Sequence, residues 1–228
     1  MATLYVIGTP IGNLEDITLR ALRVLGEVDV ILCEDTRTTK VLLDKHGIST
    51  PTLSYHTHSG IAKVEKIIEL LQEGKNLALV TDAGTPGISD PGSLLVSKVR
   101  EALPDAKIES IPGPSALTAA LSIAGVPASD FLFLGFLPHK KGRETLFKEI
   151  AEAKRTVVFY ESPHRILKTL ESLDLHLGAK LPNGKKVMIA RELTKIYEEV
   201  VSGTPDELLE FFKSNPDKVR GEFVVIVY

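Results

Sequence analysis

The stretch Thr81–Gly92, TDAGTPGISDPG, constrains the fold of this chain more than any other. It follows an apolar run at 76–80 and precedes an amphipathic segment at 93–103. A buried strand, a loop of small residues and a helix, in that order, are typical of a parallel sheet, and the loop then lies at the carboxyl edge of the sheet. Such loops usually have about two to six residues, and longer ones on a rigid scaffold are usually functional. We call this stretch the central loop.

The glycines and prolines of the central loop indicate a stiff backbone that comes close to a ligand. Glycine removes the side chain that would keep a ligand away, and proline fixes φ. Asp90 followed by Pro91 predicts a helix start, with Asp90 as the N-cap and Pro91 at the first helical position. An ordinary strand-to-helix connection with good turn chemistry is the alternative interpretation.

The rest of the chain predicts an α/β protein of two α/β domains. Strands expected near 3–7, 28–33, 52–55, 76–80 and 107–111 alternate with helices, which predicts a mostly parallel first sheet. Turn residues at 125–130 divide the chain into predicted domains 1–124 and 125–228. In the second, strand 199–202 follows strand 187–190 too closely for a helical crossover, so we expect a mixed sheet there.

Several classes of function are excluded by composition and spacing. The first turn, Gly8-Thr-Pro-Ile-Gly12, lacks the glycine spacing of a dinucleotide-binding fold. His56 and His58 lack further ligands at zinc-site spacing, so no metal site is expected. Neither a signal peptide nor a membrane span is apparent, and the one cysteine, Cys33, fits a reducing cytoplasm.

Positive charge gathers in the second half of the chain. Residues 1–134 contain 11 Lys and Arg against 16 Asp and Glu, net −5, whereas residues 135–228 contain 16 against 14, net +2. The basic clusters are 139–143, 164–168 and Lys180 with Lys185 and Lys186. Clusters of this kind contact phosphates, although solvated loops have the same composition.

Eight motifs, distributed in order along nearly the whole chain, carry a family resemblance. They are TPIGNLEDIT at 9–18, CEDTR at 33–37, the central loop, PGPSA at 112–116, GFLP at 135–138, YESPHR at 160–165, RELTK at 191–195 and GE at 221–222. The set resembles the tetrapyrrole methylase superfamily, and specifically its ribosomal RNA branch. The resemblance implies a homodimer that holds folded S-adenosylmethionine between two α/β domains. It also implies 2′-O-methylation of a cytidine in the decoding region of 16S ribosomal RNA in the small ribosomal subunit.

Position by position, the resemblance also implies a set of site residues. Those matching the cofactor-binding positions are Pro10, Asp82, Ala83, Gly84, Thr85, Pro86, Ile88, Ser115, Ala116, Glu161, Ala190 and Leu193. Candidates for placing RNA phosphates are Arg37, Lys140, Lys141, Arg143, Arg165 and Arg191.

Methyl transfer to a weakly acidic ribose hydroxyl needs a group that orients the hydroxyl and accepts its proton. The candidate carboxylates are Glu34, Asp35, Asp82, Glu161 and Glu192, and we expect Asp82 or Glu161 to assist. Two other functions stay open: a methyltransferase of the same fold acting on a small molecule such as a tetrapyrrole precursor, and a non-catalytic nucleotide-binding or ribosome-assembly module.

Overall fold

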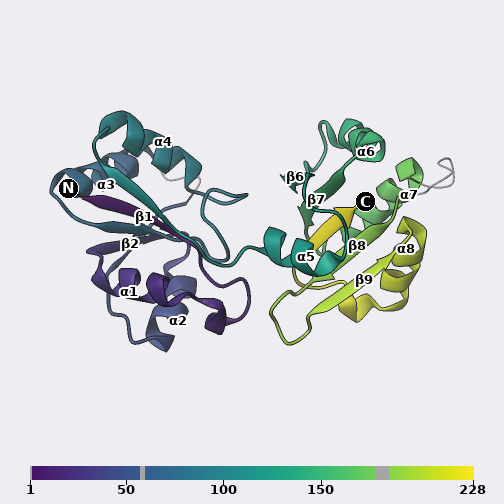
Figure 1. Ribbon diagram of the computed structural model, residues 1–228, viewed down its shortest axis with the longest axis horizontal. Coiled ribbons are helices and arrows are strands. Elements are labelled where there is room, and N and C mark those ends of the chain that lie inside the picture. Colours follow the sequence, from purple (N-terminus) through teal and green to yellow (C-terminus); the bar gives the residue numbers. More distant parts are fainter. Residues whose placement is uncertain (1, 57–59, 178–184) are drawn as a thin grey trace. The chain divides into compact units, whose positions relative to one another are not determined.

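The computed structural model describes residues 2–56, 60–177 and 185–228, so His58 and Lys180 lie outside the described residues. The chain forms two compact units, Met1–Ser115 and Ala116–Tyr228 (Figure 1). The sequence placed the division after Ala124. The structure groups helix α5 (Ala116–Ala124) with the second unit, because α5 packs against the last strand of the chain.

The first unit contains a five-stranded sheet in which every pairing is parallel, as the sequence predicted. Its spatial order is β3-β2-β4-β1-β5. The strands are β1 (Thr3–Ile7), β2 (Val30–Cys33), β3 (Thr52–Ser54), β4 (Leu77–Leu79) and β5 (Lys107–Ile111). They are joined by the helices α1 (Leu19–Glu27), α2 (Thr36–Lys45), α3 (Ile61–Gln72) and α4 (Ser93–Ala102), with a 3-10 turn, η1 (Leu14–Asp16), before α1.

The helices of the first unit cover both faces of its sheet. Buried residues of α1 and α2 form one apolar cluster with Ile31 and Ala78, and those of α3 and α4 form another with Leu32 and Leu77. The chain leaves β1 toward β2 and leaves the neighbouring strand β4 toward β5, in the opposite direction. The carboxyl ends of β1 and β4 are therefore the switch point of the sheet, where ligands bind in open α/β folds.

Local sequence explains where these helices begin, with one correction. The Thr18 side chain accepts a hydrogen bond from the Ala21 amide at α1, and Asp35 caps α2. The predicted start of α4 at Asp90 and Pro91 is wrong: Gly92 is the N-cap, and the first helical residue is Ser93. Pro91 instead closes the central loop, where its carbonyl accepts the Gly87 amide at 3.2 Å.

The second unit contains a mixed five-stranded sheet in the order β6-β7-β10-β8-β9. The pair β6 and β7 is parallel, and the other three pairings are antiparallel, which confirms the predicted mixed sheet. The strands are β6 (Phe131–Phe136), β7 (Thr156–Glu161), β8 (Val187–Arg191), β9 (Glu199–Gly203) and β10 (Phe223–Val227). The helices are α5, α6 (Arg143–Glu152), α7 (Ile166–Leu177) and α8 (Pro205–Ser214), with a second 3-10 turn, η2 (Pro216–Lys218).

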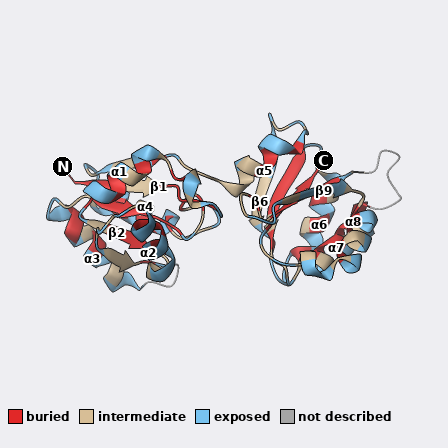
Figure 2. Cartoon of the chain, turned by 90° about the horizontal axis from the view of Figure 1, so that it is seen from below, coloured by how far each residue is buried: buried red, intermediate tan, exposed pale blue. Residues whose placement is uncertain are grey.

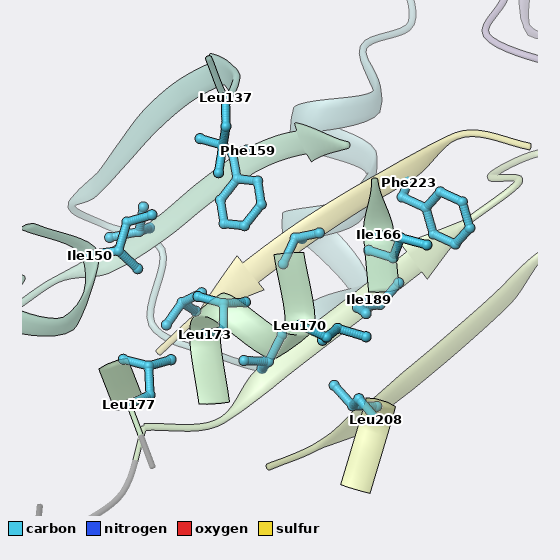
Figure 3. Close-up of a cluster of buried hydrophobic side chains, with 14 of the residues drawn as sticks. Leu137, Ile150, Phe159, Ile166, Leu170, Leu173, Leu177, Ile189, Leu208 and Phe223 are labelled. Atoms are coloured by element: carbon cyan, nitrogen blue, oxygen red, sulfur yellow. The ribbon is translucent and has the colours of Figure 1, made fainter. Parts of the chain in front are cut away.

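The core of the second unit lies between the sheet and helices α6, α7 and α8 (Figure 3). Phe159, Phe212 and Phe223 are almost completely buried there, and burial of each contributes on the order of 1.5–3 kcal/mol. In both units burial concentrates on the strands and the inner helix faces (Figure 2). The sheet edges therefore have a rigid base on which loops can hold a site.

Candidate functional site

Two loops that are far apart in sequence are tied together at the switch point of the first sheet. Thr9, in the turn after β1, and Gly84, in the central loop after β4, form an isolated antiparallel bridge. The Thr9 amide donates to the Gly84 carbonyl at 2.9 Å, and the Gly84 amide donates to the Thr9 carbonyl at 3.1 Å. The Thr9 hydroxyl also donates to the carbonyl of Thr81 at 3.0 Å. The first turn and the central loop therefore form one platform.

A third turn, after β5, contacts the same platform, and at Gly8 and Gly113 the contact is between backbone atoms. A Cβ atom added to Gly113 would lie 2.5 Å from the Gly8 carbonyl oxygen, and one added to Gly8 would lie 2.8 Å from the Gly113 Cα. The Thr85 hydroxyl donates to the Pro114 carbonyl at 3.4 Å, which ties the central loop to this turn as well. The three turns meet with very few side chains between them.

The central loop has a strongly curved backbone and amides left over for a ligand. Its φ values are positive at Gly84, Gly87 and Gly92, and also at Ser89, where φ is 65°. Within the described parts of the chain, the amides of Asp82, Ala83 and Thr85 donate to no other group. Ile88 beside them is 46% exposed. A side-chain-poor surface with amide donors and one apolar side chain fits a small ligand that is partly polar and partly apolar.

Acidic side chains lie at the neighbouring strand ends. One Asp82 carboxylate oxygen accepts the Asp35 amide at 3.1 Å, and the Thr81 hydroxyl donates to Glu34 at 3.3 Å. Asp35 also binds Arg37, and hydrogen bonds from the Arg37 side chain and amide hold the pKa of Asp35 at about 2. Asp35 and Arg37 thus neutralise each other, whereas the Asp82 carboxylate is exposed and keeps its second oxygen for another partner.

The structure brings together most of the cofactor-binding residues predicted in the first unit. The first turn and the central loop hold Pro10, Asp82, Ala83, Gly84, Thr85, Pro86 and Ile88. Ser115 is the last residue of the first unit, and Ala116 is the first of the second.

In the second unit, the predicted site residue Glu161 is surrounded by groups of the protein. Its side chain is fully buried, and both carboxylate oxygens are occupied. One oxygen contacts Arg165 at 2.8 Å and accepts the Ser162 amide at 2.8 Å, and the other accepts the Thr169 hydroxyl at 2.6 Å. The guanidinium of Arg143 lies 3.8 Å from the second oxygen. Burial lowers the pKa of Arg143, and Glu161 opposes that shift.

The residues predicted at the end of β8 are also mostly buried. Ala190, Arg191 and Leu193 are 1%, 7% and 7% exposed, and Arg191 forms an ion pair with Glu199 at 3.3 Å. Glu192 binds both Lys195 and the amide of Glu222. Burial raises the pKa of Glu192, but the hydrogen bonds outweigh it, so the net shift is downward. The contacts of Glu192 connect the segment after β8 to the turn before β10.

The predicted phosphate contacts fall into two groups. Lys140, Lys141 and Arg37 are exposed, whereas Arg143, Arg165 and Arg191 point into the protein and bind carboxylates there. Sequence reasoning missed Thr9, Gly113 and Thr169, whose partners lie across the fold. The Gly-Thr-Pro-Ile-Gly and Pro-Gly-Pro patterns mark Thr9 and Gly113 as turn residues, but nothing in the sequence identifies Thr169.

Neither a membrane helix nor a metal cluster emerges from the described ranges. Among these residues, no helix combines the length and apolar composition of a bilayer span. No group of three or more His, Cys, Asp or Glu side chains is arranged there to hold a metal ion.

Comparison with known proteins gives one consistent result. Residues 3–209 match the family described as Tetrapyrrole (Corrin/Porphyrin) Methylases. The chain is 45% identical, over 100% of its length and 98% of the relative, to "Ribosomal RNA small subunit methyltransferase I" of Thermotoga maritima. It is 47% identical to the protein of the same name from Escherichia coli O157:H7, over 98% of this chain and 77% of the relative.

Solved structures match the fold at lower identity. The uroporphyrin-III-C-methyltransferase of Thermus thermophilus has a TM-score of 0.68 and 20% identity, and the match covers 100% of this chain and 94% of that one. The methyltransferase CobJ has a TM-score of 0.71 and 20% identity with the same coverage. These two similarities establish the two-unit architecture.

Proposed function

The chain belongs to the tetrapyrrole methylase family, and from this premise we propose that it methylates ribosomal RNA with S-adenosylmethionine. The acceptor we propose is the ribose 2′-hydroxyl of a cytidine in the decoding region of 16S ribosomal RNA, within the small subunit. The observation that carries the proposal is 45% identity over the full chain to a relative named for small-subunit ribosomal RNA methylation. We further propose that the enzyme is a cytoplasmic homodimer.

The residues present in the first unit fit this cofactor. The amides of Asp82, Ala83 and Thr85 have no other partner in the described chain, so they are available to its polar groups. Exposed Ile88 offers an apolar contact, and Ser115 follows the third turn. When bound, the sulfonium supplies an activated methyl group.

We assign proton acceptance to Asp82. The ribose hydroxyl must lose its proton at about the time of attack, and a positioned carboxylate contributes typically about 10²- to 10⁴-fold to such a step. The Asp35 amide orients one Asp82 oxygen and leaves the other exposed. Glu161 is less suited, because both of its oxygens bind groups of the protein.

The test uses labelled S-adenosylmethionine with either assembled small ribosomal subunits or a precorrin. Transfer to the subunits, mapped to one ribose, supports the proposal. Transfer to the precorrin alone supports the other candidate, a small-molecule methyltransferase. The uroporphyrin-III-C-methyltransferase described above has the same fold. Cofactor binding is measured separately by calorimetry, and ribosome association without cofactor binding would indicate a non-catalytic assembly module.

Asp82→Asn tests the proton acceptor in single-turnover methylation. We expect a rate loss of about 100-fold or more with cofactor affinity nearly unchanged. Full activity of this variant would remove Asp82 from the mechanism. Sedimentation of the purified protein tests the dimer.

A further inference from the structure

A loop with an exposed positive surface joins β6 to α6 in the second unit. We call residues Pro138–Gly142 the basic loop, because they include His139, Lys140 and Lys141, all of which are exposed. Neither lysine has an acidic partner in the described parts of the chain.

Several lysines of the first unit differ in this respect. Lys40, Lys98 and Lys107 form ion pairs with Asp44, Glu101 and Glu109. Their charge is partly neutralised, whereas the charge of the basic loop is available to an external anion.

Two arginines, the buried Arg143 and the partly buried Arg165, hold the basic loop by its carbonyl groups. Arg165 donates to the carbonyl of Leu137, just before the loop, at 2.7 Å. The Arg143 side chain donates to the carbonyl of Pro138 at 3.3 Å, and its amide donates to the carbonyl of Lys140 at 3.2 Å. The conformation of the loop therefore depends on where these two guanidinium groups lie.

The Glu161 carboxylate connects the two arginines. It binds Arg165 directly, and it binds Arg143 through the Thr169 hydroxyl, which donates to Glu161 at 2.6 Å and accepts from Arg143 at 2.7 Å. One buried carboxylate thus faces two guanidinium groups. Removing it leaves two like charges, one buried and one partly buried, without this counterion, which drives them apart or toward solvent.

We propose that Glu161 is a positioning residue that holds the basic loop in shape for the phosphates of an RNA strand. Arg143 and Arg165 act through the loop, and Lys140 and Lys141 contact the phosphates. This inference rests on the proposed function for the identity of the natural RNA. Phosphate binding itself is measured independently of methyl transfer.

The experiment measures binding of a single-stranded RNA oligonucleotide to the full-length protein between 0.1 and 1 M salt. Each phosphate contact contributes about 0.7 to the slope of log affinity against log salt for a single strand. Lys140→Ala with Lys141→Ala should lower the slope by about 1.4. If the variant and the parent protein bind the RNA equally at 1 M salt, this change of slope corresponds to a loss of RNA affinity of about 25-fold at 0.1 M salt. A control variant, Lys45→Ala with Lys66→Ala on α2 and α3, should bind as the parent protein does.

Glu161→Gln should lower the salt slope of RNA binding as the lysine pair does. In the Lys140→Ala, Lys141→Ala protein it should cause little further loss of RNA affinity, because the lysine side chains that it positions are absent. The far-ultraviolet circular dichroism of Glu161→Gln should match that of the parent protein, which a general structural defect would not allow. Parent-like RNA binding by Glu161→Gln, or a loss that adds fully to that of the lysine pair, would overturn the inference.

Thr169→Val covers the case in which Glu161→Gln does not fold. It keeps all the charges and removes only the hydroxyl that links Glu161 to Arg143. We expect a partial loss of affinity with a reduced slope, and unchanged binding would contradict the proposed role. Failure of methyl transfer with intact, Glu161-dependent RNA binding would count against the proposed function and leave this inference standing.

Discussion

Substitution of Gly113 by alanine tests whether the three turns form one close-packed platform. The added Cβ would lie 2.5 Å from the Gly8 carbonyl oxygen and 2.8 Å from its carbon. Carbon atoms pack best at about 3.5–4.0 Å, so the turns must separate by on the order of 1 Å. The neighbouring atoms are backbone and cannot rotate aside. The φ of Gly113 is not in the left-handed region, so the penalty is steric.

The size of the effect follows from overpacking. A methyl group forced into a well-packed site costs about 1–3 kcal/mol. At the site, separation of the turns would also disturb the bridge between Thr9 and Gly84, whose bonds are 2.9 and 3.1 Å long. We therefore expect Gly113→Ala to destabilise the protein by about 1–3 kcal/mol and to weaken binding of S-adenosylmethionine at least tenfold.

Gly26→Ala is the matched control for this test. A Cβ at Gly26 meets nothing within 4 Å, and Gly26 lies inside helix α1. Alanine at this position should stabilise the protein by about 0.5–1 kcal/mol and should not change the affinity for S-adenosylmethionine. Urea unfolding and calorimetry are the measurements. Equal stability and cofactor affinity in Gly113→Ala and Gly26→Ala would refute the close contact.

Three further predictions address individual contacts. Thr9→Val removes a buried hydroxyl that donates to carbonyls of the central loop, and should cost about 1–3 kcal/mol in urea unfolding; an unchanged midpoint would show that solvent replaces it. Asp35 has a pKa of about 2 when folded, against 3.8, because of its hydrogen bonds from Arg37, so the stability it contributes is complete above pH 4 and lost as pH falls through 2. The stability difference between the parent and Asp35→Asn should therefore shrink over that interval, and a constant difference would contradict the sign. Alanine at Gly221, where φ is 83°, would also press its Cβ against the Glu192 side chain, so Gly221→Ala should cost at least about 1 kcal/mol, and hydrogen exchange should show the loosening in residues 191–198.

The architecture could be predicted from the sequence because local sequence patterns determine it. Alternation of apolar runs with amphipathic segments predicts the parallel first sheet. The short separation of β8 and β9 predicts an antiparallel pair. The start of α4 could not be predicted from the sequence. Asp90 and Pro91 are residues that commonly begin a helix, but here they belong to the turn of the central loop.

The candidate site could be predicted from the sequence only in part. Motif resemblance identifies which residues gather at the sheet edge, but not which side chains face inward. Glu161 is the last residue of β7 and precedes a turn, a position typical of exposed residues. Its burial depends on Arg143 and Thr169, which reach it from two different helices. Non-local ion pairs of this kind leave no periodic signal along the chain.

The bridge between Thr9 and Gly84 has a thermodynamic consequence for any ligand that binds on it. Segments that order only on binding lose conformational entropy at that moment, and the loss is subtracted from the affinity. Here folding has already incurred most of that loss, since mutual hydrogen bonds immobilise both turns. Their amide protons should exchange slowly even in the ligand-free protein, and association should release little heat from loop ordering.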